Sequence, residues 1–465
     1  TRVNSSGLVE TVELLGSDVV INGNFSNGIN SWILVGPGQE TVVDEQLVLR
    51  NTGRVRQDNV LDTSKTYIGE ITVSGVTSGS IDFYIGSSEK LTVSNNGTHT
   101  FTVINPNSAT VYIYDNGDGW DGYIDNVSVK EYTANNLARV DYDGTASSLL
   151  VEPQRTNVNT YSEDFGQSFY IKDSGVSVGT TNNVSPSGES NATKIDVTDN
   201  GRIYANVASD TYASSVFIKA GTFAYFKIGG VNIDLVAGTN ANGTIESLGS
   251  GWFRVGINYT GNRPFQIQAY PDGTYSSHTT TGDYYIWGSQ IEAGSYATSY
   301  IPTDGSTVTR VQDQYSKTGI SNLINSEEGV LFVEMAALVE VDANRRFLTL
   351  NDGGASNNVV LRYEATGVIT ARYQVGGVAQ CSIAFATTIT NSHKIAFKYK
   401  ENDFALWVDG TEIGTDTSGS VLAADTLNKI SFDHGGGSFP LFGKVKQLQV
   451  FKTALTDTEL ATLTT

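Results

Sequence analysis

Cysteine, methionine and proline are scarce in this sequence: its 465 residues include one, one and eight copies of them. A single cysteine excludes an intramolecular disulfide. Its apolar neighbours in AQCSIAFA indicate that Cys381 is a small buried side chain and not a nucleophile. No run of about 18 apolar residues occurs, so we expect no insertion into a membrane.

Basic residues are also few, because 29 Lys and Arg stand against 49 Asp and Glu, for a formal net charge of −20. No cluster of Lys or Arg in the sequence offsets this balance. Nucleic acid and anionic membrane surfaces are therefore expected to be repelled. Neutral or cationic partners stay open, as does a charge that serves solubility alone.

Glycine and tyrosine are plentiful by contrast, with 49 and 23 copies. Period-2 runs such as ATVYIYDNG and SGWFRVGINYTG alternate with polar clusters, which predicts short antiparallel strands linked by turns. The composition of a helical protein, rich in Ala, Leu, Glu and Lys, is missing. A chain of this length exceeds what one core supports and favours about three domains.

A short phrase occurs three times in similar form: TRVNSSGLVE at 1–10, ARVDYDGTASSLLVE at 138–152 and TRVQDQYSKTG at 309–319. The copies lie too far apart for a solenoid, whose repeats span roughly 20–50 residues. We therefore interpret the repeated phrase as a joint between modules.

The predicted fold class is all-β, with three tandem antiparallel β-sandwiches of jelly-roll type. The predicted division of the chain is a joint segment at 1–17 and domains at 18–137, 138–314 and 315–465. Strings of modules usually bind or build structures, and fewer of them catalyse reactions.

The first module opens with VVINGNFSNGINSW and closes with GYIDNVSVKEY. These edges resemble those of jelly-roll carbohydrate-binding modules, with matches at 22–25 and 124–127. The resemblance implies a structural calcium ion where the first and last strands meet, with Asn24 and Asp125 at the metal positions. Asn24 and Ser26 stand where that family often has acids, so the site lacks charge.

The loop DNGDGWDG at 115–122 resembles a calcium loop, but its acids fall on every third residue and not on alternate ones, which favours a polar turn. Trp120 in this loop can stack on a sugar ring while Asp121 bonds the sugar hydroxyls. With Tyr112 and Tyr114, these are the candidate carbohydrate-binding residues. The alternative is that Trp120 is a core residue, as we expect for Trp32.

The second module contains LLVEPQRTNVNTYSEDFGQSFYIK and ends in YYIWGSQIEAGSYATSYIPTDGSTVTR. These phrases resemble a module of tail-fibre, head-fibre and other structural proteins of bacteriophages. The resemblance implies a place on the virion surface, other virion proteins and surface glycans as partners, and a homo-oligomer. No heptad repeat supports a coiled-coil trimer.

The third module resembles the concanavalin-A and laminin-G-like sandwiches, through the hairpin LWVDG at 406–410 and the ending FKTALTDTEL at 451–460. In that ending Thr456 and Glu459 predict a capping box at the start of a short helix. The resemblance implies a fold and no single function, because lectins, hydrolases and spacers share this sandwich.

Catalytic patterns are weak throughout. Glucanases on this fold use an E-x-D-x-x-E strand, but Glu340 and Asp342 are followed by Arg345 in place of the second glutamate. His434 in DHGGGS suggests a metal or oxyanion site, although a glycine-rich loop explains it better. We therefore expect no enzyme.

The sequence favours an external structural protein of a bacteriophage, a head or tail fibre or decoration protein that adheres to glycans without catalysis. Two alternatives stay open. One is a purely architectural capsid or tail component, and the other is the binding arm of a secreted polysaccharide-degrading enzyme.

Overall fold

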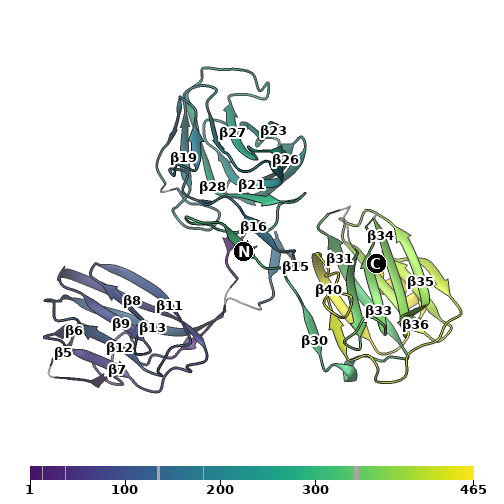
Figure 1. Cartoon of the computed structure of the whole chain (residues 1–465), viewed down its shortest axis with the longest axis horizontal. Helices are drawn as coiled ribbons and strands as arrows, with labels where there is room; N and C mark the ends of the chain where they lie inside the picture. Colours follow the sequence, from purple (N-terminus) through teal and green to yellow (C-terminus); the bar gives the residue numbers. More distant parts are fainter. Residues whose placement is uncertain (13, 37, 134–136, 182, 340–344, 366) are drawn as a thin grey trace. The chain divides into compact units, whose positions relative to one another are not determined.

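A computed structural model describes residues 1–12, 14–36, 38–133, 137–181, 183–339, 345–365 and 367–465. These residues form two compact units, one of Val12–Leu137 and one of Thr1–Thr11 with Ala138–Thr465 (Figure 1). Both are built from antiparallel sheets, so the predicted all-β class is confirmed. Within the described residues, no helix has the length and hydropathy needed to span a bilayer.

The first sandwich comprises two sheets around a core that includes Phe83, Ile113 and Ile124. One sheet has five strands, in the order β10 (Lys90–Val93), β9 (Ile81–Ile85), β12 (Val111–Asp115), β7 (Arg54–Gln57) and β4 (Ile33–Leu34). The other has the order β11 (Gly97–Ile104), β8 (Thr66–Ser78), β13 (Asp121–Thr133), β6 (Gln46–Arg50) and β5 (Gln39–Val43), with β3 (Leu14–Asp18) paired to β13.

The opening phrase NGNFSNGINSW forms a turn that is fastened to this core. Phe25 and Trp32 are buried and stack with ring centres 5.6 Å apart, which confirms the predicted core position of Trp32. Trp32 Nε1 donates to the carbonyl of Asn22 at 3.1 Å. A Cβ on Gly23 would lie 1.8 Å from the carbonyl oxygen of Val127, so only glycine lets the opening and closing segments approach this closely.

The second sandwich has a core of aromatic and branched side chains that includes Phe165, Ile218 and Ile286. Trp252 and Trp287 are both buried. Its larger sheet has the order β18 (Val176–Val178), β19 (Thr193–Val197), β28 (Gly282–Ala293), β21 (Asp210–Ala220), β26 (Trp252–Gly261) and β25 (Gly243–Gly249), with β16 (Arg155–Asn157) paired to β28 and β29 (Val308–Arg310). The other consists of β17 (Tyr170–Lys172), β20 (Arg202–Ala205), β27 (Phe265–Tyr270), β22 (Tyr225–Ile228), β23 (Val231–Asp234) and β24 (Thr239–Asn240).

The third sandwich packs a seven-stranded sheet against a six-stranded one. The first has the order β14 (Val140–Asp143), β15 (Ala146–Val151), β40 (Gly443–Phe451), β31 (Glu328–Ala337), β36 (His393–Lys400), β37 (Phe404–Val408) and β38 (Thr411–Asp416). The second has the order β30 (Ser316–Thr318), β39 (Lys429–Ser431), β32 (Arg346–Asn351), β33 (Asn358–Tyr363), β34 (Val368–Val375) and β35 (Val378–Ala386). A 3₁₀ turn, η1, spans Ser321–Leu323.

The hairpin of β14 and β15 differs from the predicted division of the chain, which places residue 138 onward in the second domain. Its Leu149 pairs with Val445 of the third sandwich, and Val151 is buried in the third core. Burial of these apolar side chains joins the hairpin to the later module. Cys381 is buried in the same core, as predicted, and burial raises the pKa of its thiol to about 12.

The chain ends in helix α1 (Asp457–Thr464), and its predicted capping box is confirmed. The Thr456 side chain accepts from the Glu459 backbone, and the Glu459 carboxylate accepts from the Thr456 backbone at 2.8 Å. Leu460 is buried against Phe332 and Trp407. The helix therefore covers the outer face of the seven-stranded sheet.

Candidate functional site

Three tyrosines lie on the outward face of the five-stranded sheet of the first sandwich. Along β12, Val111, Ile113 and Asp115 are buried, whereas Tyr112 and Tyr114 point outward and are half-buried. The strand register places Tyr112 beside Tyr84 of β9 and Arg56 of β7. It places Tyr114 beside Asp82 and Arg54 of the same two strands, which Figure 1 shows next to β12.

The side chains on this face form one stack, which we name the tyrosine ladder: Lys90, Tyr84, Tyr112, Arg54 and Tyr114. The rings of Tyr84 and Tyr112 lie 4.2 Å apart and 15° from parallel. The Lys90 ammonium lies 5.7 Å from the Tyr84 ring. The Arg54 guanidinium lies 5.3 Å from the Tyr112 ring and 4.7 Å from the Tyr114 ring. Aromatic rings and cations thus pack in one continuous stack, and each supports the next.

A buried carboxylate fixes one end of the ladder. Asp82 is 1% exposed and accepts hydrogen bonds from Lys90 Nζ at 2.5 Å and from Thr92 Oγ1 at 2.6 Å. Burial opposes its ionisation, but these bonds outweigh burial and lower the pKa of Asp82. The bond to Asp82 raises the pKa of Lys90. The end of the ladder is therefore a fixed ion pair.

The middle of the ladder keeps an unpaired cation. The Arg54 guanidinium has no hydrogen bond or ion pair with any residue that the structure describes, and only the two rings hold it. Partial burial raises the pKa values of Tyr84 and Tyr112, so their hydroxyls stay protonated at neutral pH. The face thus presents ring edges, hydroxyls and a free guanidinium, which suit hydroxyl-rich ligands.

The structure separates the four predicted sugar-binding residues. Tyr112 and Tyr114 are together on the ladder. Trp120 takes the alternative core position: it is 2% exposed, and its ring packs so closely on Gly122 that a Cβ there would lie 2.7 Å from it. The stacking role predicted for Trp120 is therefore not open to its buried indole.

Asp121 is exposed but belongs to the other sheet, at the start of β13. Its carboxylate pairs with Arg50 at 2.7 Å and accepts from Thr77 Oγ1 at 2.6 Å. The sequence reasoning missed Tyr84, Arg54 and Lys90. The alternation in SIDFYIG and GRVRQ was the available signal, because it places Tyr84 and Arg54 on the same type of face as Tyr112.

The loop at 115–122 is a polar turn, as favoured above. Asp115 is buried and accepts from the backbone of Gly117 at 2.8 Å. Asp118 accepts from the backbone and the hydroxyl of Ser80, which together lower the pKa of Asp118. Its acids therefore bond within the loop and to the turn between β8 and β9.

The residues named for calcium are engaged in local bonds. Asn24 Oδ1 accepts from the Ser26 hydroxyl at 3.0 Å, and Asp125 Oδ1 accepts from the Asn126 backbone at 2.7 Å. In the part of the chain that the structure describes, no group of three His, Cys, Asp or Glu is placed to hold a metal. One carboxylate and one amide do not fit the ligand needs of calcium, so the calcium site stays a prediction without support from these contacts.

The three copies of the repeated phrase meet within the compact unit of Thr1–Thr11 and Ala138–Thr465, where Arg2 of the first copy donates to the carbonyl of Val140 in the second at 3.4 Å. Arg139 and Arg310, from the second and third copies, both bond Glu152 at 2.8 Å. Arg139 also pairs with Asp313. Burial opposes ionisation of Glu152, but Arg310 and Arg139 outweigh it and lower the pKa of its carboxyl to about 2. We name Arg139, Glu152, Arg310 and Asp313 the joint cluster.

The first copy of the phrase is a hairpin of β1 (Arg2–Val3) and β2 (Val9–Glu10) that ends in the same kind of pair, Arg2 with Glu10 at 2.7 Å. The second copy likewise ends in the pair of Arg139 with Glu152. Arginine and glutamate thus have equivalent positions in the two hairpins.

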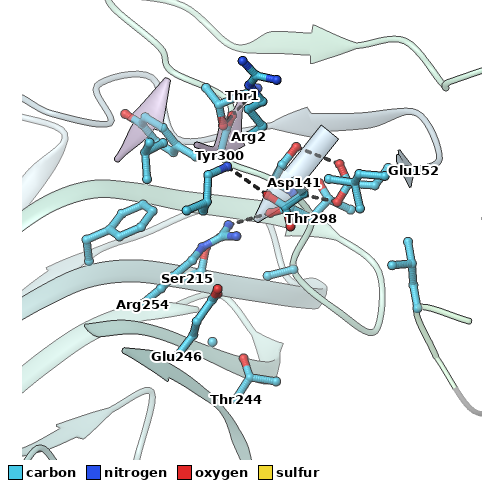
Figure 2. Close-up of a pocket in the computed structure, with 18 of the residues that line it drawn as sticks. Thr1, Arg2, Asp141, Glu152, Ser215, Thr244, Glu246, Arg254, Thr298 and Tyr300 are labelled. Atoms are coloured by element: carbon cyan, nitrogen blue, oxygen red, sulfur yellow. Dashed lines mark hydrogen bonds between the residues drawn. The ribbon is translucent and has the colours of Figure 1, made fainter. Parts of the chain in front are cut away.

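A cavity of about 220 Å³ lies beside the joint cluster (Figure 2). Figure 2 shows Arg254, Glu246 and Thr244 lining it together with Thr1 and Tyr300. Most of its charged groups have partners within the protein. Asp141 accepts from the Val3 backbone at 2.9 Å and from Lys444 at 3.1 Å. Arg254 donates to the carbonyl of Thr298 at 2.5 Å. The bonds of Asp141 join the two hairpins to each other and to β40, and the bond of Arg254 lies within the second sandwich.

The glucanase-like pair Glu340 and Asp342 lies outside the described residues. Arg345, which follows it, pairs with Glu364 at 2.7 Å.

No protein-family model and no curated protein matches the chain. Among solved structures, CBM40 of Ruminococcus gnavus IT-sialidase bound to α2,3-sialyllactose is 17% identical with a TM-score of 0.28, over 31% of this chain and 86% of that one. A heptameric SAP-like pentraxin from Limulus polyphemus is 14% identical with a TM-score of 0.26, over 33% and 74%. Sheep galectin-11 is 10% identical with a TM-score of 0.22, over 30% and 99%. At these values the likenesses bear on no ligand or reaction of this chain.

Proposed function

We propose that this protein is an external adhesive protein that binds surface glycans through the tyrosine ladder and carries out no reaction. The observation that carries the proposal is the ladder itself: stacked tyrosines on one sheet face, with the Arg54 guanidinium against the rings of two of them. The stack holds these side chains in place before a ligand arrives. Little side-chain entropy is then lost on binding, which favours affinity.

The proposal includes a place on the surface of a bacteriophage particle, in a head or tail fibre or a decoration layer. The resemblance carried by LLVEPQRTN and SYIPTDGSTVTR supports it. Other virion proteins and further copies of this chain would be its partners. Many copies on one particle would sum weak sugar contacts, and avidity can exceed single-site affinity by roughly 10²–10⁴.

The glycan test measures retention of the full chain on a glycan array and on immobilised surface polysaccharide of the host. Tyr112→Ala should lower affinity about tenfold, because it removes a ring from the middle of the stack. Tyr123→Ala is the matched control, since Tyr123 is an exposed tyrosine on the opposite sheet of the same sandwich. It should bind like the wild type.

Equal binding by wild type and Tyr112→Ala would remove the ladder as the site, and no binding at all would favour the architectural alternative. Release of reducing ends from the polysaccharide would favour the enzyme alternative. Labelling of particles with an antibody to this chain, viewed by electron microscopy, tests the virion location separately.

A further inference from the structure

A second face with aromatic and cationic groups lies on the six-stranded sheet of the third sandwich. Strand register places Phe347 of β32 beside Arg362 of β33, and Arg362 beside Thr370 of β34. Two residues further along β34, Arg372 points to the same outward side, because side chains alternate along a strand. The inward positions of these strands, such as Leu361 and Ala371, belong to the core.

The glycine-rich loop DHGGGS brings His434 onto this face. The His434 ring lies 4.3 Å from the ring of Phe347, and the Arg362 guanidinium lies 5.3 Å from the same ring. Phe439, at the end of the loop, lies 5.8 Å from Phe347 and is 45% exposed. The exposed Phe439 ring, the His434 imidazole and the Arg362 guanidinium thus all pack around the ring of Phe347.

Among the residues that the structure describes, cations on this face outnumber the carboxylates that bond them. Arg345 and Arg362 share one carboxylate, Glu364, with bonds of 2.7 Å and 2.6 Å. Arg372 has no hydrogen bond or ion pair with the described residues, and its Nε is buried without a partner. Asp433 is 8% exposed and accepts from the backbone of Gly435. We name Arg345, Arg362, Arg372, His434 and Phe439 the arginine face.

The pKa of the His434 imidazole is consistent with a surplus of positive charge on this face. Burial lowers the pKa of His434, and Arg362 and Arg372 lower it further. A neutral imidazole at physiological pH can donate or accept a hydrogen bond without adding charge.

We propose that the arginine face binds the carboxylates of an acidic polysaccharide, one rich in uronic acid. A guanidinium fork matches a carboxylate with two parallel hydrogen bonds, and the Arg372 guanidinium bonds none of the residues that the structure describes. The exposed ring of Phe439 offers a surface for the sugar ring beside that carboxylate. The face would thus recognise both the carboxylate and the sugar ring that carries it.

The net charge of −20 does not forbid this ligand. At physiological ionic strength the screening length is about 8 Å, so distant acids act weakly while arginines in contact act fully. The arginine face would therefore bind an anion that the chain as a whole repels at low salt. This site is separate from the tyrosine ladder, which belongs to the other compact unit.

The test uses the full chain and two polymers with the same sugar backbone: polygalacturonate, which carries carboxylates, and its fully methyl-esterified form, which carries none. Wild type should bind polygalacturonate in biolayer interferometry and bind the ester at least about tenfold more weakly. Arg372→Gln should lose about tenfold in affinity for polygalacturonate. Lys400→Gln is the control, because it removes one exposed positive charge from the other sheet of the same sandwich. It should bind like the wild type.

Further variants separate the two sites and the two kinds of anion. Phe439→Ala should weaken polygalacturonate binding, and Tyr112→Ala should leave it unchanged. The proposal is overturned by equal binding of polymer and ester, by equal effects of Arg372→Gln and Lys400→Gln, or by no binding of polygalacturonate. It is also overturned if dextran sulfate binds through Arg372 while polygalacturonate does not.

Discussion

The joint cluster and the arginine face use the same residue types within one compact unit, yet they differ in how charge is matched. At the joint, Arg139 and Arg310 have side chains that are 8% and 15% exposed, and they meet two carboxylates, Glu152 and Asp313. On the arginine face, Arg372 meets none among the described residues. Balanced buried charge orients the parts of a fold, whereas surplus charge at a surface leaves a place for a ligand.

The largest expected effect is at the joint. Glu152→Gln leaves Arg139 and Arg310 buried without their shared carboxylate, and it should lower the free energy of unfolding by about 3–5 kcal/mol. Urea unfolding followed by circular dichroism measures the loss, and hydrogen exchange of residues 138–152 assigns it to the joint. Glu246→Gln is the control, because it makes the same chemical change at an exposed residue that lines the nearby cavity.

A loss no greater than that of Glu246→Gln would contradict the role of the joint cluster. It would also remove the contrast with the arginine face, because both clusters would then be surface features.

Acid should weaken the joint through the same carboxylate. The pKa of Glu152 is lowered from 4.5 to about 2 in the folded chain, so the unfolded chain takes up this proton first as the pH falls. The stabilisation is therefore complete above about pH 4.5 and is lost between there and pH 2, with roughly 2 kcal/mol lost at pH 3. The difference in unfolding free energy between wild type and Glu152→Gln should shrink over this range. A difference in unfolding free energy that stays constant from pH 6 to pH 2 would contradict this role of the Glu152 carboxylate.

A smaller loss of stability is expected at Glu364, the carboxylate that bonds two arginines of the arginine face. Glu364→Gln should cost about 1–2 kcal/mol, because the Arg362 side chain is 10% exposed but that of Arg345 is 57% exposed. The same change should strengthen binding of polygalacturonate, since it removes a competing anion. A loss of stability as large as that of Glu152→Gln, with no gain in binding, would make this face a structural cluster like the joint.

The fold and the joint could be predicted in part from local pattern. Alternation and turn residues gave the strands, and Thr456 with Glu459 gave the helix start. The repeated phrase marked the segments that carry Arg139 and Arg310. That these segments meet at one glutamate could not be predicted, because the contact joins residues more than 150 positions apart.

The same distinction holds for the candidate sites: residues on one strand could be predicted together, and residues on different strands could not. Tyr112 and Tyr114 were found because one strand carries both, and their partners on β7 and β9 required strand order. Trp120 was misplaced as a candidate because its polar neighbours suggested exposure, whereas the core next to Gly122 had room for its ring. The arginine face was missed because Arg345, Arg362 and Arg372 form no run in the sequence.

The smallest effect on stability is expected for Arg372→Gln. Arg372 has no bonding partner to lose in the described part of the chain, so the free energy of unfolding should change by less than about 0.5 kcal/mol. The pKa of His434 should nevertheless rise toward its usual value, because burial and Arg362 still lower it while one nearby cation is gone. An NMR titration of the His434 imidazole measures this rise, and Lys400→Gln should leave the value unchanged. An unchanged pKa of His434 in Arg372→Gln would mean that Arg372 and His434 do not interact electrostatically. The surplus charge that distinguishes this face from the joint would then be contradicted.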